Sequence, residues 1–155
     1  MEEILKYFPE KIEIQLRNDV KDFDNLEEIR FRVNRPIVLK FNDMDKVIKY
    51  QIGTEEVLAI LQSLCENSIY SYQNQIAEGF ITIKGGHRIG ISGSCAIENG
   101  KVINIRYIYS LNFRIARQVI GCSNQVLKHI LNLESNNIYN TLIVSAPRNW
   151  KNHNT

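Results

Sequence analysis

The chain has 155 residues, of which 44% are hydrophobic and 23% are charged. This length suits one domain, or one domain with a short extension, and the composition excludes a disordered or fibrous protein. Polar residues interrupt every apolar run and the acidic start lacks a secretory signal, so we expect no membrane insertion. The three cysteines, Cys65, Cys95 and Cys122, form no CxxC pair, which indicates a reducing cytoplasm and no structural metal.

The formal net charge of +2 is unevenly distributed along the chain. Residues 1–78 contain 10 basic and 15 acidic residues, whereas residues 79–155 contain 9 basic and 2 acidic residues. A basic second half suits nucleic acid, phosphate or an acidic protein surface. The acidic half of a neighbouring copy is an equally suitable partner, and composition does not separate these alternatives.

The first third of the chain predicts two helices followed by three strands. Apolar residues at helical spacing cover residues 2–19, and Pro9 divides them into two short helices with Pro9 in the first turn of the second. Alternating apolar and polar residues, bounded by turn residues, then predict strands. These strands are residues 29–33, 37–41 and 47–52. Arg30 and Arg32 give the first strand an arginine face.

Two further helices are predicted before the middle of the chain. Gly53-Thr54-Glu55-Glu56 is a helix start in which Thr54 caps and the carboxylates favour the helix dipole. The second helix begins at Ser68 and ends at Gly79. The expected buried stripe of the first helix is Val57, Leu58, Leu61, Leu64 and Cys65. The second helix is expected to place Ile69, Tyr72 and Ile76 on one face.

Residues 80–93 are the most specific part of the sequence. Isoleucines alternate with polar residues on both sides of Gly85-Gly86, which predicts a hairpin with a two-residue turn at these glycines. Lys84, His87 and Arg88 are expected to form a cationic tip. Such a tip is able to bind an anion, but a hairpin turn with solvated basic flanks explains the same residues and is the favoured interpretation.

The last third predicts a second hairpin, a helix and a final strand. Asn99-Gly100 is a strong signal for a tight turn, and a long strand follows it over residues 102–113. A helix starts at residues 121–123, and residues 141–145 have the uniform apolar character of a buried strand. The order of elements predicts an α+β fold with a mixed, mainly antiparallel sheet and helices packed on one side.

No catalytic or metal site is expected from the pattern of reactive side chains. His87, His129 and His153 are scattered, and no second ligand is spaced to hold a metal ion with them. Glu98 and Glu134 are isolated, and no nucleophile stands beside a base. The arginines of residues 28–35 and 112–117 either reach a phosphate or pair with acidic residues on the surface.

Residues 140–155 resemble the start of a P-loop, where a buried strand leads into a phosphate-binding turn. Against the pattern GxxxxGK[ST], this chain has Ser145, Trp150, Lys151 and Asn152, so that Lys151 is a remnant Walker A lysine. Trp150 would crowd the phosphate path, and Asn152 is a poor replacement for the hydroxyl that binds Mg²⁺. We therefore expect no nucleotide site and no cofactor in this chain.

These motifs together resemble the N-terminal part of the stage III sporulation protein AA family. The most specific is Gly79-x-Ile-Thr-x-x-Gly-Gly-His-Arg-x-Gly-Ile-x-Gly93. The supporting segments are Glu28-Ile-Arg-x-Arg with Arg35-Pro36, Ser68-Ile-Tyr70, Asn112-x-Arg-Ile-Ala-Arg117 and Asn140-Thr-Leu-Ile-Val-Ser145. Members of the family are cytoplasmic proteins of the mother cell in spore-forming bacteria and resemble the hexameric motor ATPases of type II and type IV secretion systems.

The resemblance implies a domain organisation and a set of partners. Residues 1–139 would be an N-terminal α+β domain, and residues 140–155 would be the first strand of an absent RecA-like core with a degenerate, truncated P-loop tail. A frameshift, a natural truncation or a chosen chain boundary would each explain that tail. The implied partners are other copies of the chain, hexameric in the full-length family, and membrane proteins of a channel between mother cell and forespore. ATP and Mg²⁺ belong to the full-length family only.

The resemblance also implies a non-catalytic assembly or regulatory role. In secretion-type ATPases, arginines of the N-terminal domain reach the nucleotide held by a neighbouring core, where such donors stabilise the charge on the γ-phosphate. Arg88, Arg114 and Arg117 are candidates for that role, and His87 is a further interface candidate. The alternative function is a small nucleic-acid-binding module that uses the basic second half, although nucleic acid is the less favoured partner.

Overall fold

The computed structural model describes residues 2–21, 23, 25–42, 44–117, 121, 123–132, 137–142 and 144. The chain separates into two compact units, residues 1–116 and residues 117–155, and each is described by itself. No helix among the described residues has the length and apolar character needed to cross a membrane. The domain boundary expected between residues 139 and 140 stays a prediction.

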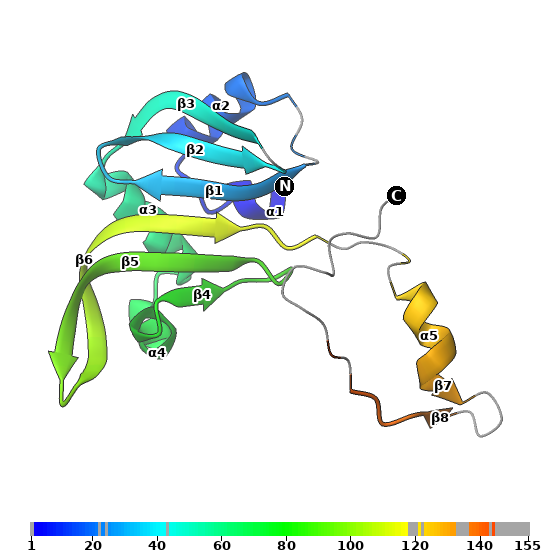
Figure 1. Cartoon of the computed structure of the whole chain (residues 1–155). Coiled ribbons are helices and arrows are strands. Elements are labelled where there is room, and N and C mark those ends of the chain that lie inside the picture. The colour runs from blue at the N-terminus through cyan, green and yellow to red at the C-terminus, as the bar shows by residue number, and fades with distance from the viewer. Residues whose placement is uncertain are drawn as a thin grey trace. The chain divides into compact units, whose positions relative to one another are not determined.

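The first unit contains a single six-stranded sheet in the order β3-β2-β1-β6-β5-β4, with every neighbouring pair antiparallel (Figure 1). Its strands are β1 (Leu26–Arg32), β2 (Arg35–Phe41), β3 (Met44–Ile52), β4 (Phe80–Thr82), β5 (Arg88–Glu98) and β6 (Lys101–Arg114). The sheet consists of two three-stranded meanders joined where β1 pairs with β6. The predicted α+β fold is confirmed, and the sheet is antiparallel throughout its described strands.

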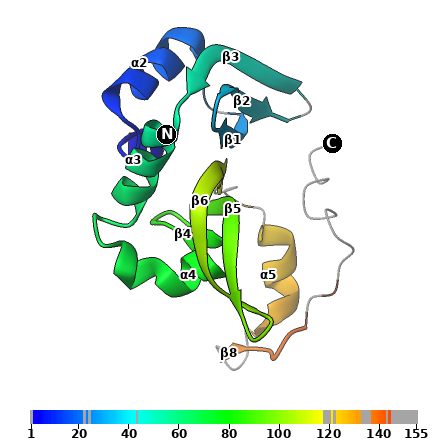
Figure 2. The same ribbon diagram turned by 90° about the vertical axis from the view of Figure 1, so that its left-hand side faces the viewer.

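Helices pack on one face of this sheet, as predicted (Figures 1 and 2). They are α1 (Glu2–Leu5), α2 (Glu10–Asp19), α3 (Thr54–Leu64) and α4 (Gln73–Ala77). Between helices and sheet, the rings of Phe8, Phe31 and Phe113 meet edge to face with centroids 5.1–5.6 Å apart. Such edge-to-face contacts add to the burial of large apolar side chains and fix how the helices lie on the sheet.

The predicted break between the first two helices is confirmed at Pro9. Pro9 is the N-cap of α2 rather than a residue of its first turn, and its C=O accepts hydrogen bonds from the N–H groups of Ile12 and Glu13 at 2.9 and 3.1 Å. A residue with β-like ψ can occupy the cap because the helical geometry begins only after it. Pro9 therefore starts α2 without interrupting a helical hydrogen bond, while α1 already ends at Leu5.

The N-cap of α3 lies one residue earlier than predicted, and one member of its predicted buried face is replaced by another residue. Gly53 is the N-cap, its N–H donates to Oε2 of Glu56 at 2.8 Å, and Thr54 is the first helical residue. Leu58 is 41% exposed, whereas Ile60 is fully buried. Ile60 keeps the i, i+3, i+4, i+7 spacing with Val57, so it takes the core position that was expected of Leu58.

The single helix predicted from Ser68 is instead a 3₁₀ turn, η1 (Ile69–Tyr72), followed by the short helix α4. The N–H of Ser71 donates to the C=O of Ser68 at 3.1 Å, which is the three-residue bond of a 3₁₀ turn. This tighter turn leaves Ile69 41% exposed, while Ile76 is buried in the core. Only part of the predicted common face therefore reaches the interior.

The hairpin between β4 and β5 has a three-residue loop, so the predicted two-residue turn is wrong. The N–H of Ile83 donates to the C=O of His87 at 3.0 Å, which leaves residues 84–86 as the loop. Gly85 and Gly86 both have positive φ, at 88° and 78°, which suits glycine. The longer loop places Ile81 opposite Ile89, so that both isoleucines face the core.

The tight turn predicted at Asn99-Gly100 is confirmed. Glu98 pairs with Lys101, and both turn residues have positive φ, as a type I′ turn requires. The alternation of side chains along β6 is interrupted at Tyr109, because Ser92 of β5 pairs with Ser110 and Gly93 pairs with Ile108. Tyr109 is thus an extra residue that shifts the phase of the strand.

The second unit contains α5 (Asn124–Ile130) and a small ribbon of β7 (Leu131–Asn132) and β8 (Asn137–Ile138). The helix predicted to start at residues 121–123 is confirmed, with Ser123 as its N-cap. Thr141, Leu142 and Val144 are in no strand, so these described residues of the predicted strand 141–145 do not bear it out. Ser145 and the remnant loop at 150–152, including Lys151, lie outside the described residues.

Candidate functional site

The face of the six-stranded sheet that no helix of the first unit covers is called the open face. Successive strand residues point to opposite sides, and Ile29 and Phe31 of β1 are buried on the helix side. Glu28, Arg30 and Arg32 therefore lie on the open face. Through the strand register, the same face also receives Lys40, Asp45, Arg88, Asn112 and Arg114.

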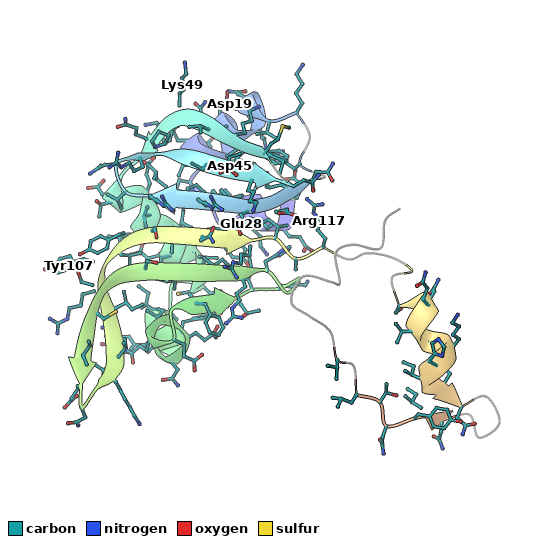
Figure 3. All side chains as sticks on the ribbon, viewed as in Figure 1. Asp19, Glu28, Asp45, Lys49, Tyr107 and Arg117 are labelled. Atoms are coloured by element: carbon teal, nitrogen blue, oxygen red, sulfur yellow. The ribbon has the colours of Figure 1, made fainter. Side chains whose placement is uncertain are left out.

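One row of residues, all charged except the one on β4, crosses the open face from β3 to β4. Directly opposed neighbours along this row are Asp45, Lys40, Glu28, Arg114, Arg88 and Thr82. Glu28 and Asp45 are labelled in Figure 3, where they come from β1 and β3, with β2 between them. The sheet thus brings together Arg88 and Arg114, two of the residues singled out from the sequence.

Arg88 and Arg114 are like charges directly opposite each other on neighbouring strands, an arrangement that lowers stability. Both side chains are exposed, and within the described part of the chain neither makes an ion pair. The guanidinium of Arg88 lies 3.6 Å from the centroid of the Phe80 ring on β4, a cation–π contact. The two arginines are therefore exposed cationic donors on neighbouring strands of one face.

The acidic residues of this face are already used by Arg30. Nε and Nη2 of Arg30 donate to Oε2 of Glu28 at 2.9 and 2.8 Å, and Nη1 lies 3.5 Å from Oδ2 of Asp45. Glu28 faces Arg114 across the strands but binds Arg30 instead. The positive charge of Arg88 and Arg114 is consequently not balanced by these two carboxylates.

Asn112 occupies the next row of the open face, opposite Arg30 on one side and Gly90 on the other. Its Oδ1 atom is buried and has no hydrogen-bond partner among the described residues. A buried acceptor without a partner lowers stability. In the sequence, Asn112 stood out only as part of a family-like motif. Asn112 lies two residues before Arg114 on the same strand, and this spacing is the sequence signal that places both side chains on the open face.

A shallow hollow of about 360 Å³ lies at another part of the open face. Arg32 and Arg35 line it, and Pro36, Val38 and Val47 form its apolar part. Both arginines are exposed, and neither makes an ion pair within the described ranges. Arginine beside apolar side chains is a frequent composition of protein interfaces. The sequence predicted the arginines of β1 but not this hollow, which needs the β2–β3 register.

His87 is not part of a cationic tip, contrary to the expectation. Its side chain is 9% exposed, and Nδ1 accepts a hydrogen bond from the N–H of Ala116 at 3.0 Å. Burial lowers the pKa of the imidazole, and the nearby carboxylate of Glu3 only partly opposes this. His87 is therefore a neutral residue of the interior, whereas the other two residues of the expected tip, Lys84 and Arg88, are exposed.

The other predicted residues are dispersed. Arg117 begins the second unit and makes an interaction of its own. Within the described ranges, no group of three His, Cys, Asp or Glu side chains is arranged to hold a metal ion. Burial raises the pKa of the Cys65 thiol, so this cysteine is not activated as a nucleophile. The open face therefore offers arginine side chains for binding rather than a nucleophile for covalent chemistry.

Comparison with known proteins gives the context of this face. A solved structure of the VirB11 ATPase from the Brucella suis type IV secretion system in complex with sulphate aligns with 74% of this chain and 35% of its own, at 15% identity and a TM-score of 0.36. Stage III sporulation protein AA of Bacillus subtilis (strain 168) is 35% identical over 152 residues, which cover 97% of this chain and 48% of the relative. The family profile described as Sporulation stage III, protein AA matches residues 1–153. This chain spans about half the length of that relative and belongs to the stage III sporulation protein AA family.

Proposed function

We propose that this chain is a non-catalytic N-terminal assembly domain of a sporulation motor ATPase that resembles the type II and type IV secretion ATPases. In this role it supports a channel complex between mother cell and forespore, and it acts in the cytoplasm of the mother cell. The family match supports the sporulation context. The replacement of all P-loop positions except Lys151 supports a role without nucleotide hydrolysis by this chain.

The observation that carries the proposal is the Arg88–Arg114 pair. Two exposed arginines are directly opposite each other on neighbouring strands, at a cost in stability, and neither makes an ion pair among the described residues. Such a cost is reasonable where the pair meets an anion on a partner. In an assembled ATPase, the nucleotide phosphates of a neighbouring subunit are anions of the right kind, and forked donors stabilise the charge that develops during hydrolysis.

His87 contributes to this role indirectly, although it was expected at the interface itself. Its hydrogen bond fixes the N–H of Ala116, two residues beyond Arg114. The strand end that carries Arg114 is thereby anchored to the interior. Arg117 is close in sequence to the end of β6, and we keep it as a candidate for an arginine that reaches the nucleotide of a neighbouring subunit.

The proposal is tested in the longer Bacillus subtilis relative, which has the half that this chain does not match. Alanine is introduced at the positions that align with Arg88 and Arg114, and ATP turnover is measured together with oligomeric state. We expect turnover to fall by about a hundredfold or more while assembly persists, as for loss of a charge-stabilising donor. The matched control is alanine at the position that aligns with Arg106, which is exposed on the part of β6 that pairs with β5 but not with β1. Unchanged turnover in the double variant would refute the role of the arginines.

Two measurements on this chain address the remaining alternatives. Calorimetric titration with ATP and Mg²⁺ should show no binding, and measurable hydrolysis would contradict a non-catalytic role. Titration with single- and double-stranded nucleic acid should also show no binding. Salt-dependent binding that weakens on Arg88→Ala substitution would favour a nucleic-acid-binding module instead.

A further inference from the structure

The hollow at the β1–β2 turn has no part in the proposed function. Val38 of β2 lies directly opposite Val47 of β3, and both valines line the hollow together with Pro36. The side chain of Val47 is 57% exposed. Arg32 and Arg35 line the same hollow, so it joins an apolar patch and two guanidinium groups in one place.

The two arginines of the hollow keep their charge available for a partner. Within the described ranges, neither Arg32 nor Arg35 makes an ion pair. Asp45 stands two residues before Val47 on β3, but its Oδ2 lies 3.5 Å from Nη1 of Arg30. The hollow is therefore positively charged, and the complementary ligand carries an anionic group.

The backbone that carries these arginines is held by its neighbours. Val33 and Asn34 form the turn between them. The N–H of Val33 donates to the C=O of Tyr109 at 2.9 Å, and the N–H of Asn34 donates to the C=O of Ile52 at 2.8 Å. The turn is thus tied to β6 on one side and to β3 on the other. A site on fixed backbone binds more tightly, because little freedom is lost when the ligand arrives.

We propose that this hollow binds an extended segment of a partner protein that carries acidic and apolar side chains. The carboxylates of the segment bind Arg32 and Arg35, since guanidinium forks match carboxylates in parallel hydrogen bonds. An apolar side chain of the segment packs against Val38 and Val47. In an extended chain every second side chain points to the same side, so residues two apart face the hollow together. This inference goes beyond the proposed function and does not use its arginine pair.

The size and lining of the hollow favour a peptide over other anionic ligands. Its volume of about 360 Å³ is at the lower end for ligand pockets, and its shallow form does not enclose a small molecule as such pockets do. No aromatic side chain is among its described lining residues, so it lacks a stacking surface for the bases of single-stranded nucleic acid. A free phosphate would gain nothing from the apolar patch.

Nuclear magnetic resonance titration of the 155-residue chain tests the site. The probe is the peptide Gly-Asp-Ser-Asp-Ser-Leu-Ser-Gly with both ends blocked, which presents two carboxylates and one leucine on the same side when extended. In low salt it should shift the backbone amide signals of the hollow, with a Kd of about 1 mM or below. These are the signals of Arg32, Arg35, Val38 and Val47.

Matched peptides separate the contributions of charge and apolar contact. A peptide with asparagine in place of both aspartates keeps the shape of the probe and removes its charge. A peptide with serine in place of leucine keeps the charge and removes the apolar side chain. Each should bind about tenfold more weakly than the probe, because each loses one of the two kinds of contact.

Variants of the chain provide the second set of controls. Arg35→Glu should weaken binding of the probe about tenfold or more, because it places a carboxylate against the carboxylates of the peptide. Val47→Ser should weaken binding of the probe but leave binding of the serine peptide unchanged. Lys101→Glu makes the same charge change beside the Asn99-Gly100 turn, outside the hollow, and should bind the probe as the unsubstituted chain does.

Several results would overturn the inference. They are an absence of shifts at the hollow, equal affinity for the probe and its asparagine form, and an equal loss in Lys101→Glu and Arg35→Glu when both show the far-ultraviolet circular dichroism of the folded chain. Displacement of the probe by an equimolar amount of inorganic phosphate would instead indicate a small-anion site. A single-stranded oligonucleotide that binds the hollow more tightly than the probe would indicate a nucleic-acid site. ATP turnover in the longer relative is measured with other arginines, so the two proposals can fail separately.

Discussion

The imidazole Nδ1 of His87 accepts a hydrogen bond from the backbone N–H of Ala116 at 3.0 Å. Gly85 makes room for this contact, because a Cβ at this position would lie 2.8 Å from Nε2 of the imidazole. A Cβ on Gly86 would lie 3.7 Å from the methyl group of Ala116, which is an ordinary van der Waals distance. The Gly-Gly-His segment therefore fixes the end of β6 through this hydrogen bond instead of forming a phosphate-binding turn.

Replacing His87 tests the role of its hydrogen bond to the Ala116 N–H. An asparagine at this position would keep an acceptor near the place of Nδ1, whereas a leucine would remove the acceptor of the part-buried Ala116 N–H. We expect His87→Leu to lower the free energy of unfolding by about 1–3 kcal/mol, and His87→Asn to lower it by clearly less. Urea denaturation followed by circular dichroism measures both, and amide hydrogen exchange at Ala116 reports the bond directly. Equal losses for the two variants would contradict a role for the hydrogen bond.

Stability should depend on pH through the same histidine. Burial lowers the pKa of His87, so the folded chain binds fewer protons here than the unfolded chain does. Folding stability then rises with pH where the unfolded state binds more protons. The contribution of His87 should be complete above an ordinary pKa of about 6.5 and decline as the pH falls below it. As the pH falls from about 7.5 to 5, the urea concentration at the midpoint of unfolding should decrease less for His87→Asn than for the unsubstituted chain. The reason is that asparagine does not titrate in this range.

Gly93 is the point at which β5 passes closest to β6. A Cβ at Gly93 would lie 2.6 Å from Cγ2 of Ile105 and 2.7 Å from the backbone oxygen of Arg106. We expect Gly93→Ala to cost about 1–3 kcal/mol of stability, because backbone atoms of β6 must shift. Gly90 of the same strand is the control, since its nearest contacts would be at 3.9 Å. Thermal unfolding of both variants should separate them, and similar melting temperatures would show that β6 adapts without cost.

The aromatic cluster should dominate the stability of the first unit. Phe113→Ala removes a fully buried ring that contacts both Phe8 and Phe31, and we expect a loss of about 3–5 kcal/mol. Tyr107→Ala on the same strand is the control, because its side chain is 78% exposed (Figure 3) and its loss should be within about 0.5 kcal/mol. Urea denaturation compares the two variants, and a small loss for Phe113→Ala would mean that helices and sheet repack around the gap.

Local sequence signals predicted the elements whose geometry depends on few residues. Asn99-Gly100 specified its turn because both residues tolerate positive φ, and Pro9 divided the first helices because it cannot continue a helical bond ladder. The α+β class followed from the order of the elements. On the open face, alternation along β1 correctly indicated that Arg30 and Arg32 share one side.

The failures arose where register between strands decides the outcome. A two-residue turn at Gly85-Gly86 would put Ile81 opposite Gly90, whereas the core requires Ile81 opposite Ile89. Matching the isoleucines first would have given the three-residue loop and placed His87 opposite Ile83, inside the protein. The extra residue at Tyr109 and the adjacency of Arg88 and Arg114 need the paired strand as well. Periodicity along one strand holds no information about them.

The seam between β1 and β6 has a consequence for folding. Within each meander, strands that are neighbours in sequence pair through short connections, so each can form from local contacts. The seam instead pairs Glu28 with Arg114 and Arg32 with Ser110, residues from opposite ends of the first unit. Because closing such a long loop costs entropy before the contacts form, we expect the two meanders to gain structure first and the seam to set the folding rate. Mutations at Phe31 or Leu111, which pair across this seam, should then slow folding, because their contacts form in the rate-limiting step.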